Sequence, residues 1–240
     1  MHPLLRVVSL LGAVALSSGF AQTGPGPAGH WEGTLQLPDR GIQLVLDLAK
    51  DDKGAWTGSF AQPEQSVSSV PLAGLKVDGK GVKFQLAAGG PNAPSFDCTQ
   101  ESAAAMSCAV ASTGGTLTAA MKRTGDAKVE LPKTSPAVTA ELEGNWEGAL
   151  ETPGGSIRIV LHFKNQPDKT VKATMDSPDQ GATDLPLSDL VQKGNAVEFQ
   201  LRLVNGGFKG TFNKESTQIA GEWSQMGNSL PLTLKKAVAK

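Results

Sequence analysis

The chain has 240 residues and carries 22 Lys and Arg against 23 Asp and Glu, which gives a formal net charge of -1. This balance leaves no excess of cations for a phosphate backbone, so we do not expect a nucleic-acid partner. With 28 Gly and 15 Pro, the composition favours many short strands and turns over long helices.

The N-terminus has the pattern of a cleavable export signal. Arg6 supplies a positive charge, residues 7–16 are almost wholly apolar, and Gly19 and Ala21 place small residues at the third and first positions before a cut. We predict a signal peptide over residues 1–21, cleaved after Ala21. The apolar run is shorter than the about 20 residues that a membrane span needs. The mature protein is therefore expected to be soluble, without a transmembrane segment, and periplasmic or secreted.

After the predicted signal peptide, the sequence contains two copies of one unit. A shift of 115 residues aligns residues 29–86 with 144–201, and 19 of these 58 positions are identical. Beyond residue 86 of the first copy, the offset between aligned residues of the two copies is 113. Identity at a constant offset indicates an internal duplication. We predict two domains, at residues 22–123 and 143–240, joined by a linker at residues 124–142 that contains two Pro and no periodic apolar pattern.

Apolar and polar residues alternate within each unit. The alternation is clear at residues 42–48 and 82–86 of the first copy and at residues 157–163, 197–201 and 230–234 of the second. A period of two indicates strands with one buried face. Seven or eight such strands per unit predict an all-β chain of two tandem small antiparallel barrels. A β-sandwich is the alternative, and a barrel is favoured because closure removes exposed sheet edges.

Each unit opens on a Gly-x-Trp motif, with Trp31 in the first copy and Trp146 in the second. This motif is similar to the opening of lipocalin-like barrels, in which the Trp closes one end of the barrel. The resemblance implies the same small-barrel architecture in both copies.

The second copy carries a more specific resemblance, to the domain that precedes the catalytic domain in many exported bacterial α/β-hydrolases and serine hydrolases. The segments that carry it are Trp146-Glu147-Gly148, Asp176-Ser177-Pro178-Asp179-Gln180-Gly181, Gly221-Glu222-Trp223-Ser224-Gln225 and Leu230-Pro231-Leu232-Thr233-Leu234. The resemblance covers essentially all of residues 144–236. The first copy resembles this domain less closely. It departs from the pattern at residues 61–66 and at Ser112, which aligns with Gln225. The catalytic domain of those proteins is absent, so the resemblance implies no hydrolase activity.

The two cysteines, Cys98 and Cys108, stand where the second copy has Gly210 and Gly221, on strands expected to be hairpin neighbours. In an exported protein this joint replacement predicts a disulfide across the hairpin. Closing such a short loop contributes about 3 kcal/mol in the loop-entropy model. Neither the spacing nor the surrounding pattern indicates a redox site.

Few residues are suited to catalysis or metal binding. His30 and His162 do not recur between the copies, and His162 lies on the polar side of an alternating strand. No three or four residues have the spacing of zinc ligands, and the sequence has no nucleophile elbow, Ser-x-x-Lys pair or phosphate-binding loop. We predict a protein without enzyme activity, metal or cofactor.

The acidic segment around Asp176, Asp179 and Asp184 raises the question of a calcium loop, because hard cations take carboxylate oxygens. The spacing matches no EF-hand, and the first copy retains only Glu64 of the three acids. Two interpretations remain, a mobile loop at the barrel mouth and a contact surface for a ligand or partner. The candidate residues of that surface are Asp176, Ser177, Pro178, Asp179, Gln180, Gly181 and Gln225.

Large aromatic side chains are the second set of candidates. Core packing is one interpretation, and lining of an apolar ligand cavity is the other, because small barrels often bind ligands in their interiors and mouths. The candidates are Trp31, Trp56, Phe84, Trp146, Phe199 and Trp223.

Two functions of different class follow. In the first, the protein is an exported binding protein whose barrels hold a small apolar ligand or an envelope component, which requires a cavity. In the second, it is an accessory module that contacts another protein or the cell envelope, which requires an exposed patch.

Overall fold

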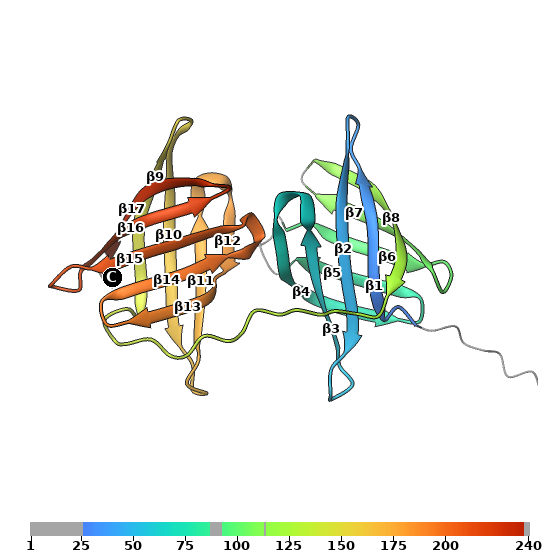
Figure 1. Ribbon diagram of the computed structural model, residues 1–240, viewed down its shortest axis with the longest axis horizontal. Coiled ribbons are helices and arrows are strands. Elements are labelled where there is room, and N and C mark those ends of the chain that lie inside the picture. The colour runs from blue at the N-terminus through green and yellow to red at the C-terminus, as the bar shows by residue number, and fades with distance from the viewer. Residues whose placement is uncertain (1–25, 87–92, 113, 238–240) are drawn as a thin grey trace, which may run out of the picture.

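The computed structural model describes residues 26–86, 93–112 and 114–237, so the predicted signal peptide over residues 1–21 lies outside the described residues. Nearly every element is a β-strand, and the strands form two antiparallel barrels that lie next to each other along the long axis of the molecule (Figure 1). The all-β, two-barrel prediction is confirmed.

Eight strands close the first barrel, and each pairs with its neighbour in sequence until β8 pairs with β1. These strands are β1 (Gly29–Gln36), β2 (Gly41–Lys50), β3 (Trp56–Gln62), β4 (Val67–Asp78), β5 (Gly81–Leu86), β6 (Ser95–Gln100), β7 (Ala105–Ser112) and β8 (Gly115–Gly125). Because the sheet is closed, the β-sandwich alternative does not apply to this domain.

Nine strands form the second barrel. They are β9 (Gly144–Thr152), β10 (Gly155–Asn165), β11 (Val171–Ser177), β12 (Ala182–Pro186), β13 (Ser188–Lys193), β14 (Ala196–Leu201), β15 (Gly206–Phe212), β16 (Gln218–Gln225) and β17 (Asn228–Lys236). The two ends of this sheet, β12 and β13, are separated only by Leu187 and together correspond to β4 of the first barrel. The extra strand is thus an interruption of a repeated element.

The predicted alternation places one face of each strand inside. In β2, Leu44, Leu46 and Leu48 are buried in the first core, and in β10 Ile159, Leu161 and Phe163 are buried in the second. Since successive side chains of a strand point to opposite faces, this period of two produces the two separate cores.

The repeated Gly-x-Trp-x-Gly motif also has a steric reason. A Cβ on Gly33 would collide with the backbone of β8 at Ala120, and one on Gly148 would meet the carbonyl oxygen of Thr233 on β17. Glycine at these two positions therefore leaves room for the close approach of the first and last strands of each barrel.

Within the described residues, three short 3-10 turns connect successive strands. They are η1 (Pro63–Gln65), η3 (Pro178–Gln180) and η4 (Arg202–Val204). Each ends on a left-handed residue, which is Ser66, Gly181 and Asn205 respectively. The first two turns occupy equivalent positions of the two copies, so the duplication extends to turn geometry.

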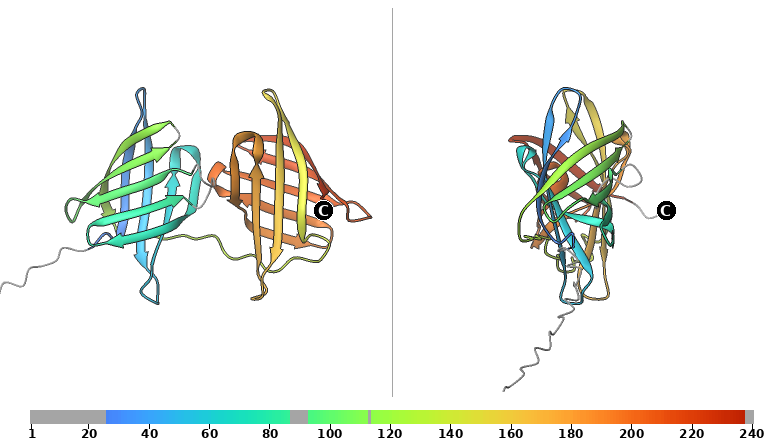
Figure 2. Two further views of the ribbon diagram at one scale, coloured as in Figure 1. Left: turned by 180° about the vertical axis from the view of Figure 1, so that it is seen from behind. Right: turned by 90° about the vertical axis from the view of Figure 1, so that its right-hand side faces the viewer.

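The predicted linker crosses from one barrel to the other in an extended path, seen from two further sides in Figure 2. Its backbone N–H groups at Lys128 and Glu130 bond to side chains of β2 and β3, and Ser135 accepts a backbone hydrogen bond from β11. Two residues inside the predicted linker, Val138 and Leu142, are buried in the second core. The segment is therefore fastened to both barrels.

Candidate functional site

The first barrel has a filled interior. Phe84 stacks on Phe96 with ring centroids 4.6 Å apart, and Phe60 packs against the same ring at 5.6 Å. The cavity among these core side chains measures only about 10 Å³. A cavity this small holds at most about one water molecule, so Phe84 acts here as a packing residue.

Trp31 and Trp146 are held in the same way on the first strand of each barrel. Both are fully buried, and their indole N–H groups donate to the carbonyl oxygens of Pro27 and Leu142, four residues earlier in each case. A cation from the last strand covers each ring, Arg123 at 4.7 Å and Lys236 at 5.5 Å from the ring centroid. The two tryptophans thus tie the chain segment before the first strand to the barrel.

The remaining aromatic candidates separate into core, surface and pocket. Phe199 lies between Phe163 and Phe208 in the second core. Trp56 is half-buried on β3, with the ammonium of Lys50 over its ring at 5.3 Å. Trp223 is the one of these aromatic candidates that lines a large pocket in the described part of the chain.

That pocket lies in the second barrel and has a volume of about 330 Å³. Its size is at the lower end of the range for small-molecule sites. No residue in its lining is charged. Among the apolar residues of its wall are Leu150, Ile157, Ile159, Met175, Leu185 and Leu201. The exposed Met226 lies at its edge, in the turn between β16 and β17.

Trp223 reaches this pocket because Gly206 lies beneath its ring. A Cβ on Gly206 would collide with the indole, so any larger residue would displace the ring from the strand. In the first copy the equivalent positions hold Val110 and Pro94, as the cross-strand pairs of β6 and β7 show. This substitution pair distinguishes the two interiors.

The polar residues of the lining are Thr152, Gln180, Gln225 and Asn228, and the two glutamines accept hydrogen bonds from neighbouring side chains. The indole N–H of Trp223 donates to Gln225 Oε1 at 3.1 Å, and the Ser177 hydroxyl donates to Gln180 Oε1 at 2.8 Å. Because an indole N–H is only a donor, the bond fixes the orientation of the Gln225 amide. Both amide NH2 groups are left without a protein acceptor among the described residues. The pocket therefore offers hydrogen-bond donors beside apolar walls.

The carboxylates of the acidic segment accept hydrogen bonds from neighbouring strands. Asp176 accepts from the backbone N–H of Asp184 at 2.8 Å and lies 3.1 Å from His162 Nε2. Asp179 accepts from both the backbone N–H and the side chain of Arg158. Within the described residues no three His, Cys, Asp or Glu side chains are grouped as metal ligands would be.

Asp179 and Arg158 form an ion pair and shift each other's pKa. Hydrogen bonds from the side chain and backbone of Arg158 hold the pKa of the Asp179 carboxyl below its ordinary value, and Asp179 in turn raises the pKa of Arg158. Asp179 therefore remains ionised and fixes η3, whose Gln180 lines the pocket.

The two histidines occupy equivalent cross-strand pairs. His30 pairs with Asp47 between β1 and β2, and Asn145 pairs with His162 between β9 and β10. Their Nδ1 atoms lie 2.8 Å from Asp47 Oδ1 and 2.9 Å from Asn145 Oδ1. The His is thus on opposite strands in the two copies, which is why simple alignment hides the relation.

Cys98 and Cys108 form the predicted disulfide, directly opposite each other on β6 and β7. Gly210 and Gly221 are paired in the same way on β15 and β16. Stable disulfides belong to oxidising compartments, so this bond agrees with export.

The sequence pattern predicted Trp223, Gln180 and Gln225 as candidate site residues, but it did not predict the aliphatic residues of the pocket wall. Those wall residues have the same alternating pattern in both copies. The signal that separates the copies is the exchange of Val110 for Trp223, Ser112 for Gln225 and Pro94 for Gly206.

No protein-family model matches the sequence, and no curated protein matches it. One similar solved structure is a protein of unknown function from the DUF3598 family of Nostoc punctiforme, with 12% identity, 88% of this chain and 96% of that chain covered, and a TM-score of 0.28. Another is a candidate outer membrane protein of Bacteroides fragilis, with 13% identity, 88% and 97% covered, and a TM-score of 0.27. Neither similarity assigns a function to this chain.

Among the described residues, no helix is long and apolar enough to cross a membrane. The fold defines a tandem β-barrel protein, with one filled barrel and one that contains an open pocket.

Proposed function

We propose that the protein is an exported, non-catalytic binding protein that holds a small, neutral and largely apolar molecule in its second barrel. The observation that carries this proposal is the pocket of about 330 Å³ with aliphatic walls and no charged residue in its lining. The first barrel, with its filled interior, serves as a structural partner.

The uncharged lining argues for a neutral ligand. Burying an ion without a counter-charge costs several kcal/mol, whereas each buried methylene contributes about 0.8 kcal/mol. The free amide NH2 groups of Gln180 and Gln225 favour a ligand that carries a hydrogen-bond acceptor, such as an ester, amide or ketone oxygen.

The lining also supports a non-catalytic role. It holds no His, Cys, Ser, Asp, Glu or Lys. Its only hydroxyl, on Thr152, donates to the carbonyl oxygen of Gly155 at 2.7 Å within a turn. A nucleophile with an adjacent base, which acyl transfer needs, is not assembled there.

Export is supported by the signal-peptide pattern of residues 1–21 and by the disulfide. The alternative function, an accessory module with the resemblance to hydrolase-associated domains, requires an exposed apolar patch. The large apolar side chains most exposed in the described part of the chain are Leu131, Val191 and Met226. Leu131 and Met226 line different pockets, so binding in pockets is favoured over a flat contact surface.

The test uses N-phenyl-1-naphthylamine, a neutral fluorescent probe whose emission rises in apolar surroundings. The mature protein should bind one probe molecule, and Leu230→Trp, which adds bulk inside the pocket, should abolish binding. The matched control is Leu117→Trp, at the equivalent half-buried position of the first barrel. Equal binding by both variants, or no binding by the folded wild type, would refute the pocket assignment.

A further inference from the structure

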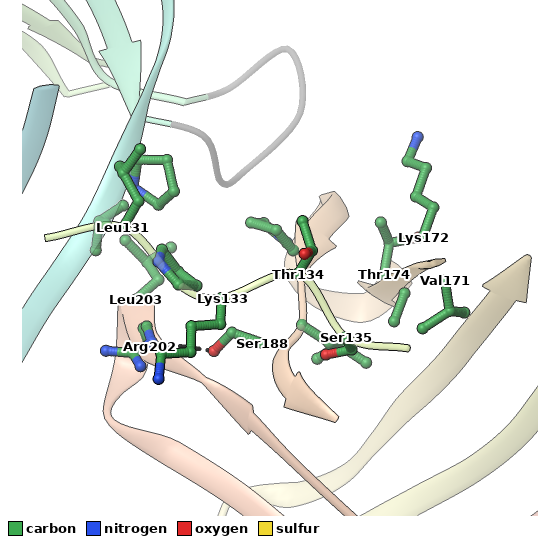
Figure 3. Close-up of a pocket in the computed structure, with 16 residues that line it drawn as sticks. Leu131, Lys133, Thr134, Ser135, Val171, Lys172, Thr174, Ser188, Arg202 and Leu203 are labelled. Carbon is green, nitrogen blue, oxygen red and sulfur yellow. Dashed lines mark hydrogen bonds between the residues drawn. The ribbon is translucent and has the colours of Figure 1, made fainter. Parts of the chain in front are cut away.

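A second pocket lies between the two barrels. It has a volume of about 350 Å³, close to that of the barrel pocket, and its lining comes from β4, the linker, β11, β12, β13 and η4 (Figure 3). Val70 and Pro71 form the side contributed by the first barrel, and Leu131 contributes from the linker. The lining of this pocket thus comes from both barrels and from the linker.

Leu203 of η4 fixes this arrangement. Its side chain packs against the hydrophobic cores of both barrels. Ser135 of the linker also lines the pocket and makes two hydrogen bonds to the second barrel. Its hydroxyl oxygen accepts from the backbone N–H of Leu190, and its carbonyl oxygen accepts from the backbone N–H of Val171. The pocket walls are therefore tied to both domains.

The lining of this pocket carries only positive charge. Lys133, Lys172 and Arg202 contribute to it, and no acidic side chain does. Arg202 is paired with Asp189 at 2.8 Å and donates to Ser188, so its charge is partly compensated. Lys133 and Lys172 are exposed and have no ion-pair partner among the described residues. Figure 3 shows the Lys172 side chain directed away from the other labelled residues, so Lys133 supplies the uncompensated charge of this apolar pocket, which is complementary to an amphipathic anion.

We propose that the pocket between the barrels binds a small amphipathic organic anion, of the class of medium-chain carboxylates, with its apolar body against Val70, Leu131 and Leu203 and its charge beside Lys133. This site is separate from the uncharged barrel pocket. The two are adjacent through η4, where Leu203 lines the pocket between the barrels and Val204 lines the pocket in the barrel.

The test compares two probes that differ by one sulfonate, N-phenyl-1-naphthylamine and the anionic 8-anilinonaphthalene-1-sulfonate. The mature protein saturated with the neutral probe should still bind the anionic one. Decanoate should displace the anionic probe and methyl decanoate should not. Raising the salt to about 0.5 M should weaken binding of the anionic probe, because exposed charges are screened.

Variants locate the site. Lys133→Gln should weaken binding of the anionic probe about two- to fivefold, the range for an exposed ion pair. Lys193→Gln, at an exposed position outside the pocket lining, should leave it unchanged. Thr134→Trp, which fills the pocket from the linker, should abolish it, with near-UV circular dichroism showing that the variant is folded. Leu230→Trp should leave it intact.

Loss of anionic-probe binding in Leu230→Trp would overturn the proposal, because the probe would then occupy the barrel pocket. Unchanged binding in both Lys133→Gln and Thr134→Trp would also overturn it. Failure of the neutral probe alone would affect only the barrel pocket, so the two proposals fail separately.

Discussion

At the residue scale, the two Gly-x-Trp tryptophans are held by several elements at once. Each is fully buried, donates to a carbonyl oxygen in the segment before its barrel, and is covered by a cation of the last strand. The cation–π contact adds to the burial and the hydrogen bond. Each tryptophan thus connects the segment before its barrel, the first strand and the last strand.

Truncation of Trp146 should therefore be costly. Trp146→Ala is expected to lower the free energy of unfolding of the second barrel by about 3 to 5 kcal/mol. Trp146→Phe keeps most of the packing but leaves the carbonyl oxygen of Leu142 without its donor, so it should cost about 1 to 3 kcal/mol. Both losses can be measured by urea unfolding, with hydrogen exchange of peptides from each barrel as the readout. A loss below about 1 kcal/mol for Trp146→Ala would contradict the assigned packing.

The Asp179–Arg158 pair should make the second barrel acid-sensitive. Because the pKa of Asp179 is lowered on folding, its contribution to stability is present above its unfolded pKa of about 3.9 and is lost as the pH falls through the folded value. Wild type should therefore be more stable than Asp179→Asn at pH 7, and the difference should vanish in strong acid.

Urea midpoints measured across that pH range test this. Asp39→Asn is the control, because Asp39 is exposed and makes no hydrogen bond through its side chain within the described residues. A difference between wild type and Asp179→Asn that persists below the folded pKa would show that the effect is not electrostatic.

At the scale of elements, the β6–β7 hairpin shows how one position was used in two ways. The first copy holds the Cys98–Cys108 disulfide, while the second has Gly210 facing Gly221. A Cβ on Gly221 would collide with the backbone of Lys209, and one on Gly210 would collide with the ring of Phe208. In the second barrel, close packing takes the place of the covalent bond.

Removal of the disulfide should destabilise the first barrel alone. The double variant Cys98→Ala and Cys108→Ala is expected to lose about 3 kcal/mol of unfolding free energy there, the loop-entropy value for a closure of this length. Hydrogen exchange should speed up in peptides of β6 and β7 and stay unchanged in β15 and β16. Equal loss of protection in both barrels would mean that they unfold as one unit.

The strands themselves could be predicted, because alternation at residues 42–48 or 157–163 follows directly from burial of one face. The interruption at Leu187 could not, since the same residue type continues β4 without a break in the first copy, at Leu72. The candidate site was predicted only in part. Trp223, Gln180 and Gln225 stood out in sequence, but whether an interior is filled depends on how Phe60, Phe84 and Phe96 meet across strands.

At the scale of the whole molecule, the linker joins rather than separates the barrels. Residues 124–142, predicted as a linker between two domains, bond to β2 and β3 on one side and to β11 on the other. Leu203 packs on both cores.

Leu203→Asp should loosen this arrangement, because it replaces the apolar contacts of Leu203 with both cores by a charged carboxylate. Trypsin cleavage after Lys133 is expected to become faster, while hydrogen exchange within the second barrel stays as in wild type. Val191→Asp is the control, since Val191 is 42% exposed and lies on β13. Unchanged cleavage in Leu203→Asp would show that the linker is held without Leu203.

The most direct test of the binding function is to purify the mature protein from its native exported compartment, extract it with organic solvent and analyse the extract by mass spectrometry. We expect a stoichiometric, neutral, largely apolar molecule from wild type and from Leu117→Trp, and none from Leu230→Trp. An empty extract from folded wild-type protein, together with no binding of N-phenyl-1-naphthylamine, would contradict a ligand-binding role for the second barrel.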